Sequence, residues 1–180
     1  MIWERGPLTV RELRDSDEKD LIKWMSDPEV LAFYEGRDQP HDSELVQKHF
    51  YQKDDRVTPC LILFHEAPTG YIQFYSLSEK EAQAYGYTNE KRIFGMDQFI
   101  GESAYWNQGV GTTLVSTMAH YLCSELGAQK VVMDPQAWNR RAIRCYEKSG
   151  FRSVRMLPKH EFHEGKWRDC LLMEYVCKGR

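Results

Sequence analysis

Long hydrophobic runs are missing from this 180-residue sequence. No apolar stretch approaches the ~20 residues that a membrane-spanning helix needs. The N-terminal segment carries charges within its first five residues and has no apolar h-region of the kind that a signal peptide contains. We therefore expect no membrane segment, no secretory signal and no membrane partner.

An excess of positive charge is also missing, since the net charge is -3 at pH 7. Nucleic-acid binding normally requires a clustered basic face, so we expect no nucleic-acid partner, whereas a cationic small molecule would be compatible. The hydrophobic content of 42% and charged content of 28% are ordinary for a soluble globular protein. Without a composition break or an internal repeat, the sequence predicts a single domain over residues 1–180.

Closely spaced cysteine pairs are missing too. The five cysteines are odd in number and have no C-x-x-C spacing; they are Cys60, Cys123, Cys145, Cys170 and Cys177. We expect reduced thiols in a cytoplasmic protein. The group His160, Glu161, His163 and Glu164 lacks a standard zinc spacing, so we expect a solvated loop and no metal site.

Hydrophobic periodicity predicts an α+β fold with a mixed, mostly antiparallel central sheet flanked by helices. The expected strands are residues 8–13, 60–64, 71–77, 93–100, 130–133, 151–156 and 170–176. The expected helices lie near residues 18–25, 28–34 and 43–50, after Gly111 and after Asn139. We expect a turn at residues 67–70, an exposed connection at 79–91 and a charged loop at 160–169.

The stretch from Gly95 to Gly111 contains the first candidate site. A hydrophobic strand carrying Asp97 leads through a short loop to the turn Gln108-Gly109-Val110-Gly111, which opens an amphipathic helix. Backbone N–H groups at a helix start lack intrahelical partners and carry the positive end of the helix dipole, so they stabilise an anion such as phosphate. On its own, such a glycine turn is weak evidence, because a glycine pair between a strand and a helix is often only a tight connection.

A second segment, Asn139-Arg140-Arg141-Ala142-Ile143-Arg144-Cys145-Tyr146-Glu147-Lys148-Ser149-Gly150-Phe151, makes the pattern specific. Together with the glycine turn it resembles the GCN5-related N-acetyltransferase (GNAT) superfamily, over nearly the whole chain. Residues 95–102, 133–135, 141–146 and 163–165 are most similar to the aminoglycoside 6′-N-acetyltransferases. The turn departs from the family pattern in having Trp106 and Asn107 at its first two positions, where the family has Arg or Gln first.

The resemblance implies acetyl transfer from acetyl-CoA to a primary amine on a polycationic sugar. The resemblance implies that the acceptor substrate is bound by Tyr34, Asp97, Asp134 and Glu164. It also implies that acetyl-CoA is bound by Phe99, Ile100, Gln108, Gly109, Val110, Gly111, Thr112, Asn139, Ala142 and Tyr146. The chain is expected to be a monomer or a homodimer.

Asp97 and Tyr146 are the expected catalytic residues. Full proton transfer from an alkylammonium to an aspartate with an ordinary pKa costs roughly 9 kcal/mol. Asp97 is therefore expected either to anchor the ammonium or, in surroundings that favour the neutral acid, to act as a general base. A tyrosine hydroxyl can protonate a leaving thiolate with a modest uphill step, and a strand N–H from Phe99 or Ile100 can polarise the thioester carbonyl. Cys145 is expected to be a packed side chain, because direct attack by the amine needs no acyl-enzyme.

Two alternatives stay open at the level of sequence. The same scaffold could acetylate a different amine, such as a protein N-terminus or a siderophore precursor. It could also be a non-catalytic acyl-CoA-binding domain, although the presence of both Asp97 and Tyr146 argues against that.

Overall fold

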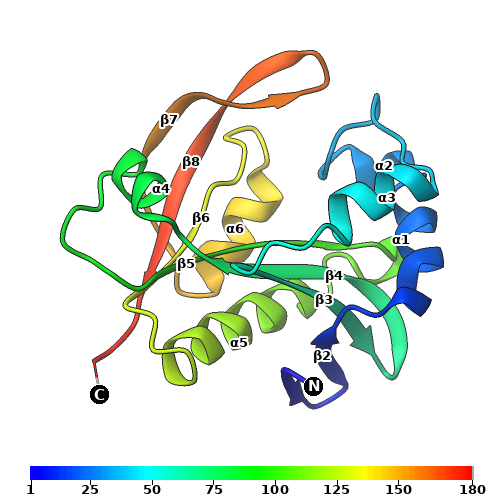
Figure 1. Cartoon of the computed structure of the whole chain (residues 1–180), viewed down its shortest axis with the longest axis horizontal. Helices are drawn as coiled ribbons and strands as arrows, with labels where there is room; N and C mark the ends of the chain where they lie inside the picture. The colour runs from blue at the N-terminus through cyan, green and yellow to red at the C-terminus, as the bar shows by residue number, and fades with distance from the viewer. Residues whose placement is uncertain (180) are drawn as a thin grey trace. The chain divides into compact units, whose positions relative to one another are not determined.

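The computed structural model describes residues 1–179 and contains an eight-stranded sheet with six α-helices (Figure 1). The strands are β1 (Trp3–Arg5), β2 (Leu8–Glu12), β3 (Val57–Phe64), β4 (Ala67–Ser76), β5 (Ile93–Ile100), β6 (Lys130–Met133), β7 (Arg152–His163) and β8 (Lys166–Val176). The α-helices are α1 (Glu18–Trp24), α2 (Pro28–Leu31), α3 (Ser43–Phe50), α4 (Glu79–Ala84), α5 (Val110–Ser124) and α6 (Arg140–Lys148).

The sheet is mixed, with strand order β1-β2-β3-β4-β5-β6-β8-β7. The pairs β1/β2, β2/β3, β6/β8 and β7/β8 are antiparallel, whereas β5 and β6 are parallel. The register between β5 and β6 covers Ile93, Phe94 and Gly95, and it goes no further along β5. The predicted fold class is therefore confirmed, and no helix among residues 1–179 is long and apolar enough to cross a membrane.

The chain divides into two compact units. The first comprises Met1–Gln73 and Asp97–Val110. Helices α2 and α3 begin at capping side chains, because Asp27 accepts a hydrogen bond from the Glu29 N–H and Asp42 accepts one from the Leu45 N–H. Their apolar faces meet in a buried cluster that includes Leu21, Trp24, Met25, Val30, Leu31, Val46, Phe50, Leu61, Tyr71 and Phe99.

The second unit comprises Phe74–Met96 and the chain from Gly111 onward. Its longest helix, α5, buries Leu114, Val115, Met118, Ala119 and Leu122 at steps of one, three and four residues, as an amphipathic helix does. A separate apolar cluster contains Ala82, Tyr87, Ile93, Val132, Leu157, Cys170 and Leu172.

Three local predictions are wrong. The β3/β4 turn lies at His65 and Glu66, both with positive φ, and residues 67–70 belong to β4. The connection at 79–91 contains helix α4, which Ser78 and Glu81 start with a reciprocal capping box. The charged segment 160–169 is a hairpin rather than a loop, with β7 and β8 joined at Glu164-Gly165.

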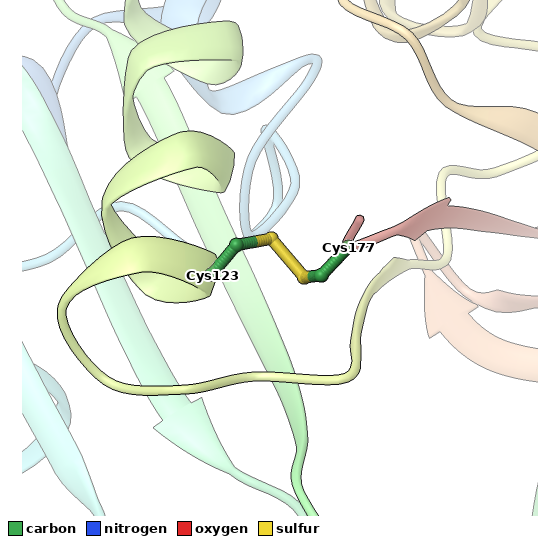
Figure 2. The surroundings of a disulfide bond; sticks show 2 residues. All are labelled: Cys123 and Cys177. Carbon is green, nitrogen blue, oxygen red and sulfur yellow. A yellow bond between two sulfur atoms is a disulfide. The ribbon is translucent and has the colours of Figure 1, made fainter. Parts of the chain in front are cut away.

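The expectation of five reduced thiols is also wrong. Cys123, near the end of α5, forms a disulfide with Cys177, just after β8 (Figure 2). The two positions are 54 residues apart, so no local spacing pattern could have paired them. Cys60, Cys145 and Cys170 are free thiols.

Candidate active site

Asp97 lies on β5 and receives a hydrogen bond from a neighbouring amide. Gln73 donates from Nε2 to Asp97 Oδ2 at 3.0 Å, and the Tyr71 hydroxyl donates to Gln73 Oε1 at 2.8 Å. Burial raises the pKa of the Tyr71 hydroxyl, which is 1% exposed, so that it remains a neutral donor. The relay fixes the orientation of the Gln73 amide, and a donated hydrogen bond favours the charged carboxylate.

Tyr34 follows α2 and packs against the apolar cluster of the first unit. Its ring centroid is 4.6 Å from that of Phe99 and 6.5 Å from that of Phe50. These contacts leave the side chain partly buried. Tyr34 is therefore an aromatic side chain held by packing in the same unit as Asp97.

The turn before α5 has the backbone conformation that an anion site requires. Asn107 has φ of 58° and Gly109 has φ of 80°, and α5 begins at Val110 with no acidic residue in its first turn. A side chain at Gly109 would meet no other atom within 4 Å, so conformation rather than crowding favours glycine there. Successive N–H groups in such a turn form a concavity for anions.

Trp106 explains how the turn departs from the family pattern. Its Nε1 donates to the Ile100 carbonyl at 2.8 Å, and its ring lies against Phe33 with centroids 5.9 Å apart. Trp106, which stands where the family pattern has Arg or Gln, thus holds the segment after β5 in place.

In the second unit, three of the residues predicted to bind acetyl-CoA, Asn139, Ala142 and Tyr146, lie on or beside α6. Asn139 caps this helix by accepting a hydrogen bond from the Ala142 N–H at 3.2 Å. Tyr146 is partly buried, with its ring centroid 6.3 Å from that of Phe151. The predicted helix after Asn139 is confirmed.

The first turn of α5 packs directly against α6. A Cβ at Gly111 would lie 3.4 Å from Cys145 Sγ, and Thr112 Oγ1 lies 3.8 Å from the same sulfur. Burial raises the pKa of the Cys145 thiol. A neutral thiol is a poor nucleophile, so the partly buried Cys145 contributes packing here.

Asp134 follows β6 and has two polar partners within its own unit. Tyr85 donates to Asp134 Oδ2 at 3.0 Å, and His160 Nε2 lies 2.8 Å from the same oxygen. This hydrogen bond raises the pKa of His160, so the pair forms an ion pair when the imidazole is protonated. The sequence interpretation missed His160, because its place on β7 opposite Asp134 depends on the unforeseen hairpin.

Glu164 stands at the tip of that hairpin with φ of 48°. Its Oε1 lies 3.7 Å from Nε2 of the buried His163. The carboxylate oxygens nearest to His160 and His163 therefore come from different residues, Asp134 and Glu164.

The predicted site residues divide between the two units. The first unit holds Tyr34, Asp97, Phe99, Ile100, Gln108, Gly109 and Val110, whereas the second holds Gly111, Thr112, Asp134, Asn139, Ala142, Tyr146 and Glu164. Within the first unit, Tyr34 and Phe99 are in ring contact.

Comparison with known proteins gives consistent results. Residues 14–158 match the family model described as "Acetyltransferase (GNAT) domain". The aminoglycoside N(6′)-acetyltransferase type 1 of Klebsiella pneumoniae is 26% identical over 147 residues, which cover 80% of this chain and 73% of that protein.

Two solved structures share the fold. A crystal structure of the aminoglycoside acetyltransferase AAC(6′)-Ib with coenzyme A and kanamycin superposes with a TM-score of 0.73 at 24% identity, covering 94% of each chain. A spermidine N-acetyltransferase from Vibrio cholerae with coenzyme A and spermine gives 0.74 at 18% identity, covering 96% of this chain and 97% of the other. Because the family model covers most of the sequence, this chain belongs to the GNAT acetyltransferase family.

Proposed function

We propose that this protein is a cytoplasmic, acetyl-CoA-dependent N-acetyltransferase that acetylates the 6′-amino group of aminoglycosides by direct attack of the amine. The observation that carries the proposal is the carboxylate of Asp97, held on β5 by the Gln73 amide at 3.0 Å. The sequence likeness to the Klebsiella pneumoniae enzyme supports the choice of acceptor. The family match spans parts of both compact units, which supports treating residues 1–180 as one acetyltransferase domain.

The turn before α5 fits the diphosphate of acetyl-CoA. The positive φ values at Asn107 and Gly109 and the absence of acids in the first turn of α5 suit a doubly charged anion. We assign the diphosphate to the backbone of Gln108, Gly109, Val110, Gly111 and Thr112. The pantetheine arm is assigned to Phe99, Ile100, Asn139, Ala142 and Tyr146.

Acetyl-CoA supplies an activated acyl group, and the chain supplies positioning and proton handling. The amine nitrogen bonds to the carbonyl carbon, the C–S bond breaks, and the thiolate needs a proton. Backbone N–H groups of Phe99 or Ile100 would polarise the carbonyl, and the Tyr146 hydroxyl would donate the proton to sulfur.

The contact with Gln73 sharpens the role proposed for Asp97. Because a donated hydrogen bond favours the charged carboxylate, Asp97 is better suited to bind and orient an ammonium than to remove its proton unaided. The proton would leave through water as the uncharged amine attacks. The sequence left both roles open, and the Gln73 contact favours the anchor.

Acceptor binding would use the remaining acids and one aromatic ring. Asp134 and Glu164 offer carboxylates to a polycation, and Tyr34 offers a ring face for a sugar. A net charge of -3 also favours the approach of a cationic substrate. We propose a monomer or homodimer, with no nucleic-acid or membrane partner.

The test is acetyl-CoA-dependent thiol release across a panel of aminoglycosides, polyamines and peptides, with the position of acetylation determined by NMR. We expect turnover with aminoglycosides that carry a 6′-amine and none with their 6′-hydroxyl counterparts. Turnover only with peptides or polyamines would overturn the acceptor while preserving the chemistry. Tight acetyl-CoA binding without any thiol release would instead indicate a binding domain.

A further inference from the structure

Three potential metal ligands converge in the helical part of the first unit. Glu35, His41 and His49 each offer one ligand atom, and these atoms all lie within 4.8 Å of one another. Glu35 follows α2, His41 precedes the N-cap of α3, and His49 lies in the last turn of α3. These residues have no role in the proposed acetyl transfer, and no local sequence motif links them.

His41 is already oriented as a metal ligand would be. The residue is 2% exposed, and its Nδ1 lies 2.6 Å from the Gln39 carbonyl oxygen, to which it can only donate. In the neutral imidazole, Nε2 therefore carries the lone pair. A ligating histidine characteristically donates its other N–H to a backbone carbonyl or carboxylate in this way.

That Nε2 lone pair is directed at His49. His41 Nε2 and His49 Nδ1 are 2.7 Å apart, so one proton is shared between two nitrogens that could both bind a metal. Glu35 and His49 are exposed. The cluster thus has one buried, fixed ligand and an open side through which an ion and water can enter.

We propose that Glu35, His41 and His49 form a binding site for a divalent transition-metal ion, with Zn²⁺ the best-suited ion. Two imidazoles and one carboxylate are a known zinc ligand set, with water completing a tetrahedral shell. Imidazole ligands disfavour Ca²⁺ and Mg²⁺, which prefer oxygen. The site goes beyond the proposed acetyltransferase function and does not depend on it.

Metal binding requires a small rearrangement. Ligands at ~2.0–2.1 Å from a tetrahedral Zn²⁺ are about 3.4 Å apart, so the two imidazoles must separate by roughly 0.7 Å and lose the shared proton. His49 can make this movement because its side chain is exposed at the end of α3. The ion would tie the segment after α2 to α3, and Tyr34 directly precedes the ligand Glu35. Without metal, the same residues are a hydrogen-bonded histidine pair beside an acid.

The test uses the full chain without an affinity tag, stripped of metal with a chelator and titrated with Zn²⁺ by calorimetry at pH 7.5. We expect one Zn²⁺ per chain and a higher melting temperature with metal. His49→Ala and Glu35→Gln should each weaken binding by at least about tenfold. His120→Ala removes an exposed histidine from α5 in the other unit and should bind as the wild type does.

Co²⁺ distinguishes this site from binding to thiols. The proposal predicts visible absorption bands of tetrahedral Co²⁺ without a thiolate charge-transfer band, and their loss in Glu35→Gln, whose substitution at an exposed position should preserve the fold. The proposal would be overturned by an absence of stoichiometric uptake, by unchanged affinity in both ligand variants, or by a thiolate band.

Discussion

The side-chain amide of Gln73 donates a hydrogen bond to Asp97 across 3.0 Å, and the buried Tyr71 hydroxyl fixes that amide by donating to its oxygen. Gln73 lies on β4 and Asp97 on β5. The proposed acceptor anchor is therefore oriented by a side chain that makes no direct contribution to the chemistry.

We predict that Gln73→Leu slows acetylation without weakening acetyl-CoA binding. A hydrogen bond to a charged group is worth about 1.5–3 kcal/mol, so kcat/KM for the amine should fall by roughly tenfold to a hundredfold. Gln73→Glu, which keeps the size but cannot donate to a carboxylate, should be impaired at least as much. Gln47→Leu, at an exposed position of α3, is the matched control and should behave as the wild type. Unchanged kinetics in Gln73→Leu would show that the relay does not position Asp97.

We predict that His160 contributes to stability in acid rather than in base. Its hydrogen bond with Asp134 raises its pKa, so its contribution is fully present below the ordinary histidine pKa and is lost as pH rises through the raised value. Both side chains are partly exposed, which limits the effect to about 1 kcal/mol. The difference in melting temperature between wild type and His160→Gln should therefore shrink between pH 5.5 and 8.5. A difference that grows with pH would contradict the assigned pair.

We predict that opening the Cys123–Cys177 disulfide destabilises the fold. Closing a loop of 54 residues should contribute about 4 kcal/mol by restricting the unfolded chain. Thermal unfolding of the oxidised protein should therefore occur about 10 °C above that of Cys177→Ser. A reductant should lower the wild-type midpoint to that of the variant and leave the variant unchanged. Equal midpoints before and after reduction would show that the disulfide adds nothing to stability. The comparison is relevant because a reducing cytoplasm would keep these two thiols reduced.

We predict that Cys145 is dispensable for chemistry. Burial raises the pKa of its thiol, so little thiolate is present at neutral pH. Cys145→Ala should retain kcat within about twofold, because direct attack by the amine needs no acyl-enzyme. Mass spectrometry of the wild type after incubation with acetyl-CoA should find no acetyl group on this residue. An acetylated Cys145 that transfers its acyl group to added amine would contradict the direct mechanism.

Patterns within one element were readable from the sequence, and relationships across the chain were not. Strands β5 and β6 and the helices α3 and α6 were predicted because periodicity and helix-start signals are local. The helix α4 was missed although its capping-box spacing was present, because its polar and tyrosine-rich segment suggested an exposed connection.

The turn positions were predicted wrongly for a different reason. The β3/β4 turn uses His65 and Glu66 in the left-handed region, which glycine and asparagine adopt more readily, so Pro68 and Gly70 drew the prediction to the wrong place. The end of the β7/β8 hairpin, residues 160–169, is largely exposed and charged, and it therefore lacks the apolar alternation that marks a half-buried strand. The contacts Gln73–Asp97 and His160–Asp134 depend on strand positions, which the sequence does not encode locally.

The most direct test compares wild type with Asp97→Asn in acetyl-CoA-dependent thiol release with kanamycin, alongside calorimetric titration of each with acetyl-CoA. The account predicts turnover by the wild type, a loss of about a hundredfold or more in the variant, and equal acetyl-CoA affinity for both. Turnover of kanamycin by Asp97→Asn at the wild-type rate would contradict the role of Asp97. A wild type that binds acetyl-CoA but releases no thiol with any aminoglycoside would contradict the proposed function itself.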